Sequence, residues 1–172
     1  IDEIKFVHPK VVQDGKVDIT GDDSTTNLPF DPRVKLAFDH HESELLRVNS
    51  EELKQKFIIE GEAKSAARVV YNYYGGAKTF TRVSEEIMTA VDKGDSADFT
   101  QDEILDPKGW VLLNFLMDER TGLGRFHDFR ISNYDLMMEL ITYCVDHPID
   151  EIMQLPDVKE RVDLYFEQQE LF

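Results

Sequence analysis

Cysteine is almost absent from this sequence, and long apolar runs are missing altogether. Cys144 is the single cysteine among 172 residues, which excludes an internal disulfide framework and makes a reduced, cytoplasmic setting the expectation. It lies in an apolar helical pattern, which favours a buried thiol over a nucleophile. No stretch approaches the roughly 20 apolar residues of a membrane-spanning helix, so no membrane contact is expected.

Basic residues are also in short supply. The chain has 19 of them against 35 acidic residues, a net charge of −16. A protein that binds long nucleic acids needs a basic footprint, so this function class is not expected. Phosphorylated substrates stay open, because bound divalent cations can reverse the local field.

Short apolar runs come first in the chain, and helical patterns follow. The runs predict strands at Ile4–His8, Val17–Thr20 and Val34–Phe38. Helical spacing and capping residues predict helices at about 63–74, 84–93, 109–118, 133–146 and 157–172. This order predicts an α/β fold with a parallel-sheet core at 1–108, followed by a helical part of the same domain at 109–172.

The tripeptide Asp39-His40-His41 follows the strand predicted at Val34–Phe38. Ligands of open α/β sheets bind at the carboxyl ends of strands. Side chains alternate along a strand, so His40 is expected on one face and Asp39 with His41 on the other. That arrangement offers one imidazole to a metal and the other to a substrate, and a mixed histidine and carboxylate shell favours Mn or Fe. The alternative is a surface turn with a solvated histidine pair.

Asp92 and Asp95 lie where the helix beginning near residue 84 is predicted to end. A carboxylate is mildly unfavourable at a helix carboxyl end, where the macrodipole is already negative. A bound cation would remove that penalty, which makes both residues candidate metal ligands. An ordinary acidic loop is the alternative.

Four segments together resemble the DHH family of phosphoesterases, which includes RecJ-like exonucleases, nanoRNases and manganese-dependent inorganic pyrophosphatases. LAFDHHESELLR at 36–47 resembles the family signature, and SAARVVYNYYGG at 65–76 the helix that follows it. AVDKGDSADF at 90–99 resembles the fourth motif. The segment 109–134 is similar to the exopolyphosphatase-related branch.

The resemblance implies a two-metal hydrolase that uses Mn²⁺, with Mg²⁺ as the alternative ion. His40 and Asp95 would be metal ligands, and Asp92 a weaker candidate. His41 would face the substrate as a catalytic group supported by Asp39. The family's second motif is an aspartate at a strand end. By register Asn27 occupies that region, as a candidate substrate-binding residue, and the alternative is Asp23 as a metal ligand.

The resemblance also implies a phosphorylated substrate. Arg120, Arg125 and Arg130 are candidate phosphate-binding residues, although ordinary surface or ion-paired arginines are the favoured interpretation. The family's first motif has no counterpart in these residues, so its strand would lie upstream of Ile1. The helix at 157–172 resembles a linker to a further carboxyl-terminal domain. This chain alone is therefore expected to be inactive.

Two classes of function remain open at this point. The first is a metal-dependent hydrolase of short polyphosphate, a small phosphodiester or a short oligonucleotide. The second is a catalytically degenerate domain that binds metal or nucleotide in a regulatory role, which a neutral Asn27 would favour. A structural domain with an incidental Asp-His-His is a third reading. The sequence does not choose the substrate, and it leaves a homo-oligomer open.

Overall fold

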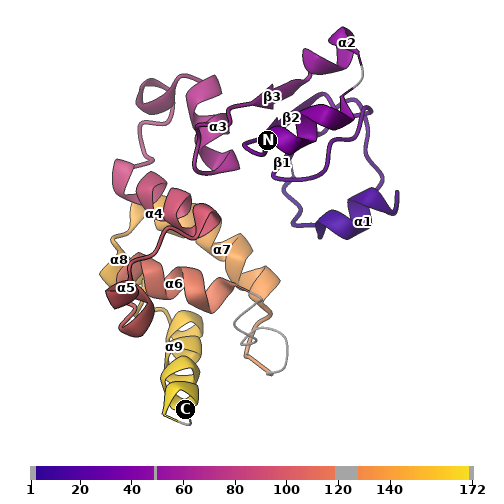
Figure 1. Ribbon diagram of the computed structural model, residues 1–172. Coiled ribbons are helices and arrows are strands. Elements are labelled where there is room, and N and C mark those ends of the chain that lie inside the picture. The colour runs from indigo at the N-terminus through magenta and orange to yellow at the C-terminus, as the bar shows by residue number, and fades with distance from the viewer. Residues whose placement is uncertain (1–2, 49, 119–127, 171–172) are drawn as a thin grey trace. The chain divides into compact units, whose positions relative to one another are not determined.

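The computed structural model describes residues 3–48, 50–118 and 128–170. The chain divides into two compact units, Ile1–Thr81 and Arg82–Phe172 (Figure 1). Each unit has its own hydrophobic core. No helix in the described part of the chain is long and apolar enough to cross a membrane.

The first unit is built on a parallel sheet (Figure 1). Its strands are β1 (Ser24–Thr26), β2 (Leu36–Asp39) and β3 (Phe57–Ile59), in the order β1-β2-β3. Thr26 lies opposite Phe38, and Asp39 lies opposite Ile59. The predicted parallel α/β core is therefore confirmed.

Helices surround this sheet. The longest, α3 (Ala66–Tyr73), packs against β1 and β2. Ser65 caps it by accepting a hydrogen bond from the Arg68 backbone at 3.0 Å, and Gly75 follows it with φ of 96°, a conformation that glycine adopts without strain. The short helices are α1 (Pro9–Gln13), η1 (Glu42–Arg47), α2 (Glu51–Lys54) and η2 (Gly76–Lys78).

Two strand predictions are wrong, and two strands were not predicted. Ile4–His8 and Val17–Thr20 form no strand in the structure. The segment before α1 stays irregular because Pro9 starts a helix that His8 caps. The strands β1 and β3 have three residues each, too few to show the alternation of apolar and polar residues that predicts a strand, and β1 is also polar.

The second unit is all-helical in its described residues (Figure 1). Its buried core joins aliphatic residues of three helices with Ile152 and Tyr165. Leu116 and Leu136 are almost fully buried in it. The helices are α4 (Glu85–Ser96), α5 (Gln101–Leu105), α6 (Gly109–Met117), α7 (Asn133–Asp146), α8 (Ile149–Ile152) and α9 (Pro156–Gln169).

Capping residues set the ends of these helices much as the sequence predicts. Ser84 accepts from the backbone of Ile87 at 3.2 Å, and Ser132 from that of Asp135 at 3.1 Å. Helix α7 ends at Asp146, directly before His147 and Pro148, as expected. Cys144 on α7 is half-buried, and burial raises the pKa of its thiol.

Helices 85–105 belong to the same compact unit as the helices that follow. Gly94 of α4 lies so close to the Asn114 side chain of α6 that a Cβ there would clash. Asn114 Nδ2 in turn donates to the Ala90 carbonyl at 3.2 Å. The boundary between the two compact units therefore lies between Thr81 and Arg82. The sequence predicts a boundary between residues 108 and 109.

Candidate functional site

Three carboxyl ends of parallel strands meet at one edge of the sheet in the first unit. Asn27 directly follows β1, and its backbone N–H donates to the Phe38 carbonyl at 3.0 Å. Asp39 is the last residue of β2, and its carbonyl accepts from the backbone N–H of Glu60, after β3, at 3.3 Å. This is the edge at which open parallel sheets bind their ligands.

Asp39 organises that edge. Its side chain is 3% exposed. One carboxylate oxygen, Oδ1, accepts three hydrogen bonds, from the backbone N–H of His40 at 2.7 Å and of His41 at 2.9 Å, and from His41 Nδ1 at 2.7 Å. An oxygen engaged by three donors is well suited to orient its neighbours. Asp39 is thus placed to support His41, as the resemblance implies.

The ring of His40 has a defined tautomer. Its Nδ1 lies 3.2 Å from the Ala63 carbonyl oxygen in the loop after β3. A carbonyl oxygen only accepts, so Nδ1 carries a hydrogen, and in a neutral ring the lone pair lies on the buried Nε2. A backbone carbonyl behind the distal ring nitrogen is the usual support of a metal-binding histidine.

The ring of His41 is oriented in the same way by a different acceptor. Its Nδ1 donates to Asp39, so Nε2 is the ring nitrogen that remains available for a ligand. The side chain is 56% exposed, so this nitrogen is accessible to a ligand.

The two histidines lie side by side, which corrects the expectation of opposite faces. Their ring centroids are 4.2 Å apart, with planes at 71°. Strand alternation does not apply to them because β2 ends at Asp39. Candidate ligand atoms of Asp39, His40 and His41 all lie within 4.8 Å of one another.

This donor set fits a borderline divalent cation. His40 Nε2 is the best placed ligand, because its lone pair is held in position and Asp39 Oδ1 already serves three donors. Imidazole nitrogen next to a carboxylate suits Mn²⁺ better than Ca²⁺. When bound, such an ion supplies an activated water and neutralises charge on phosphoryl oxygens.

The structure separates the two candidates for the second motif. Asn27 lies at the carboxyl end of β1, level with Asp39, and has a left-handed backbone with φ of 53°. Asp23 precedes β1 and lies at the opposite edge. Its carboxylate accepts from the backbone N–H and hydroxyl of Thr20, both at 2.8 Å, and these bonds lower its pKa. Asn27 thus lies at the strand end and Asp23 does not, and which of the two fills the second motif remains a prediction.

The loop after β3 contributes contacts that the sequence reading missed. Ala63 anchors His40, and Gly61 lies against the side chain of Glu42, where a Cβ would clash. A signal was present: the apolar run Phe57-Ile58-Ile59 followed by Glu60-Gly61 is typical of a strand and turn.

Asp92 and Asp95 lie in the second unit, inside α4 rather than after it. The helix continues to Ser96, because Ala97 adopts the left-handed conformation that ends it, with φ of 54°. Asp92 is buried and Asp95 is exposed. Their joining the histidines in one metal site remains a prediction.

Of the three candidate arginines, only Arg130 lies within the described residues. Arg120 and Arg125 lie outside them. Arg130 pairs with Asp157 through both Nε and Nη2, and the ion pair raises the pKa of the guanidinium. The favoured sequence interpretation, an ion-paired arginine, is the arrangement observed.

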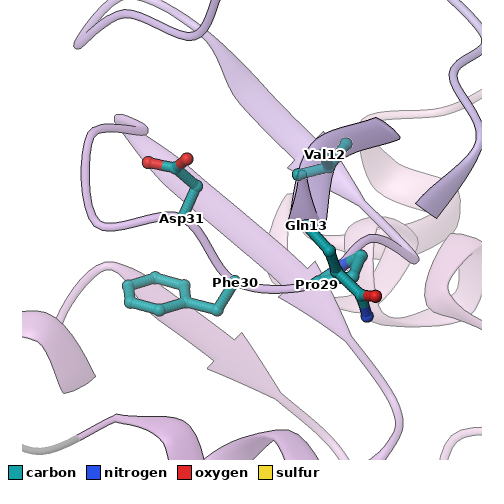
Figure 2. Close-up of a pocket in the computed structure, with 5 residues that line it drawn as sticks. All are labelled: Val12, Gln13, Pro29, Phe30 and Asp31. Carbon is teal, nitrogen blue, oxygen red and sulfur yellow. The ribbon is translucent and has the colours of Figure 1, made fainter. Parts of the chain in front are cut away.

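A separate hollow of about 450 Å³ lies between α1 and the loop that follows Asn27 (Figure 2). Val12 and Gln13 line it from the helix, and Pro29, Phe30 and Asp31 from the loop. Asp31 is paired with Arg33 at 2.7 Å, which lowers the pKa of the carboxyl. None of the Asp39, His40 and His41 side chains lines this hollow.

Comparison with known proteins points to one class of enzyme. No family model matches the chain, and no curated protein matches it. A solved structure described as the pGpG-specific phosphodiesterase PggH from Vibrio cholerae is 57% identical, with a TM-score of 0.87. The match covers all of this chain and 54% of that one, so the chain spans about half the length of its relative. The likeness establishes a shared fold and supports a phosphoesterase of the phosphodiesterase type, without extending to the exopolyphosphatase-related branch.

Proposed function

We propose that the protein is a metal-dependent phosphodiesterase that hydrolyses short linear dinucleotides such as pGpG. The observation that carries the proposal is the pair of oriented imidazoles at the carboxyl edge of the sheet, in a chain similar to a pGpG-specific phosphodiesterase. Mn²⁺, with Mg²⁺ as the alternative, is the ion that the donor set favours.

The residues divide the work according to their hydrogen bonds. His40 presents a buried lone pair for the cation, and Ala63 holds its ring. His41 presents an accessible Nε2 that donates to a phosphate oxygen when protonated, or takes a proton when neutral. Asp39 keeps that ring in the tautomer which frees Nε2 for either role.

Asn27 favours a second candidate function. It holds the strand-end place where a carboxylate is expected, and its amide oxygen is neutral. A degenerate domain that binds metal or nucleotide without turnover fits this substitution. Asn27→Asp distinguishes the two functions, because aspartate tolerates the left-handed backbone at this position.

The test is release of GMP from pGpG in the presence of Mn²⁺, followed by chromatography. Turnover would also overturn the expectation, drawn from the sequence, that this chain alone is inactive. Hydrolysis breaks one P–O bond, water supplies the hydroxyl and proton, and two GMP molecules form. We expect His41→Ala to reduce kcat/KM by about 100-fold. His8→Ala, a change of an exposed residue that caps α1, is the matched control and should have little effect.

The outcomes separate the candidates. Turnover of pGpG that depends on His41, with slower release of phosphate from linear tripolyphosphate, supports the phosphodiesterase. Metal binding without turnover, restored by Asn27→Asp, supports the degenerate domain. Equal activity in His41→Ala and His8→Ala would contradict the proposal.

A further inference from the structure

Helix α9 in the second unit holds the segment 129–133 through one buried arginine. Arg161 has no exposed surface, although it carries a full charge. Its Nε donates to Asn133 Oδ1 at 2.7 Å and its Nη2 to the Ile131 carbonyl at 2.8 Å. The guanidinium also lies 4.0 Å from the centre of the Phe129 ring. These contacts hold residues on both sides of Arg130, through the Ile131 carbonyl and the side chains of Phe129 and Asn133.

The same helix orients the side chain of Arg130. Asp157 lies one helical turn before Arg161, and its carboxylate accepts from Arg130 Nε at 2.8 Å and from Nη2. Glu160 accepts from the Arg130 backbone N–H at 3.2 Å. The Asp157 side chain is 6% exposed, whereas that of Arg130 is 66% exposed.

The geometry of this pair directs one edge of the guanidinium outward. A side-on pair uses Nε and one terminal nitrogen, so the edge formed by the two terminal nitrogens points away from Asp157. Arg161 already anchors the segment, and solvent screens the exposed guanidinium of Arg130, although the carboxylate of Asp157 is buried. The pair therefore contributes mainly orientation.

We propose that Asp157 and Arg161 are positioning residues that hold Arg130 as a pre-oriented contact for a phosphate group. The inference rests on the proposed function for the identity of the anion, a phosphate monoester or diester. Guanidinium suits this task because its planar edge matches two phosphate oxygens, and fixing it in advance lowers the entropic cost of binding. Arg161 acts through the backbone of 129–133, and Asp157 acts through the side chain of Arg130.

The experiment records the Nε–H NMR signals of the arginines in the chain while inorganic phosphate is added. In the wild-type chain, we expect a protected Arg130 signal that shifts with phosphate. Asp157→Asn should remove that protection and weaken the phosphate response about tenfold, which is the loss expected for one charge-assisted hydrogen bond. Arg161→Lys should weaken it as well, because a single ammonium group cannot replace the planar fork that donates to both Asn133 Oδ1 and the Ile131 carbonyl.

The pair Arg82–Asp146 in the same unit provides the matched control, since it joins the same groups with both side chains largely exposed. Asp146→Asn should leave the Arg130 response unchanged. Arg130→Gln, a change at a mostly exposed side chain, tests phosphate binding even if Asp157→Asn fails to fold. Its readout is the backbone amide signals of residues 129–133, whose shifts on addition of phosphate should be abolished.

Two results would overturn the inference: an equal phosphate response at Arg82 and Arg130, or a phosphate response that survives Arg130→Gln. Hydrolysis kinetics distinguish a failure of this inference from a failure of the proposed function. If the protein hydrolyses pGpG, Arg130→Lys should raise KM about tenfold while kcat changes little. If it does not, the proposed function fails while the phosphate titration still decides the role of Arg130.

Discussion

The two units of this chain differ in their net charge and in the orientation of their candidate ligand groups. The first carries 14 acidic and 11 basic residues, a net charge of −3, and the second carries 21 and 8, a net charge of −13. Charge alone would place cation binding in the second unit. The pre-oriented imidazole nitrogens lie in the first, and the proposed metal site would require lone pairs held in position.

Four carboxylates of the second unit are held in ion pairs with basic side chains. Glu103 pairs with Lys93 at 2.5 Å, Asp106 with Lys108 at 2.6 Å, and Asp146 and Asp157 each pair with an arginine. The remaining negative charge creates a diffuse field that attracts cations but selects no ion, and salt screens it. The following changes test this division.

Separate cores should give separate responses to truncation. Leu116 is fully buried in the second unit and Val34 in the first. Leu116→Ala should cost about 3 kcal/mol and Val34→Ala about 2 kcal/mol of unfolding free energy, through lost burial and a residual cavity. Amide hydrogen exchange should show lost protection in α6, α7 and α9 for the first variant and in β2 for the second. Loss of protection in both cores with either variant would contradict the division.

Removing the charge of one carboxylate should matter far more in the first unit than in the second. Asp39→Asn should lower kcat/KM for pGpG about 10- to 100-fold, as for other groups that orient a ligand from behind. Long-range ¹⁵N–¹H spectra should show His41 losing its single tautomer. Asp146→Asn, the corresponding change at an exposed ion pair, should leave both measurements close to wild type. Asp39→Asn with normal activity and a single His41 tautomer would be the contrary result.

The smallest expected effect concerns Glu103. Its pKa is lowered to about 2, first by the hydrogen bond from Lys93 and then by those from the backbone and hydroxyl of Thr100. Because the pKa is lower in the folded state, the ionised carboxylate stabilises the fold at pH values above the ordinary pKa. This contribution is lost as pH falls from about 4.5 to about 2. In a ¹³C titration of the carboxyl group, Lys93→Met should move the midpoint up, and Thr100→Ala should move it less. An unchanged midpoint in Lys93→Met would show that the pair does not hold this carboxylate.

The sequence predicted the parts of the site that are local in the chain. Asp39, His40 and His41 follow a buried strand, and Ser84 and Ser132 cap their helices, as their patterns indicate. The parallel sheet was also predicted, although β1 is polar and both β1 and β3 are too short to show a period.

Contacts between distant residues could not be predicted in the same way. The acceptor that fixes the His40 tautomer lies 23 residues away in a loop, and it is a backbone carbonyl, which any residue can supply. Arg161 was one charge in a charged helix, and nothing local marks it as the buried one. Its partners at Ile131 and Asn133 are about 30 residues earlier and become neighbours only through packing.

In the proposed function, geometry in the first unit, and not charge in the second, sets where Mn²⁺ binds. Mn²⁺ added to the ¹⁵N-labelled chain reports this directly, because its paramagnetism broadens nearby amide signals. We predict broadening centred on Asp39–His41 at the lowest Mn²⁺ concentrations, abolished by His40→Ala. Broadening that is spread over residues 82–170 and unchanged in His40→Ala would contradict the claim.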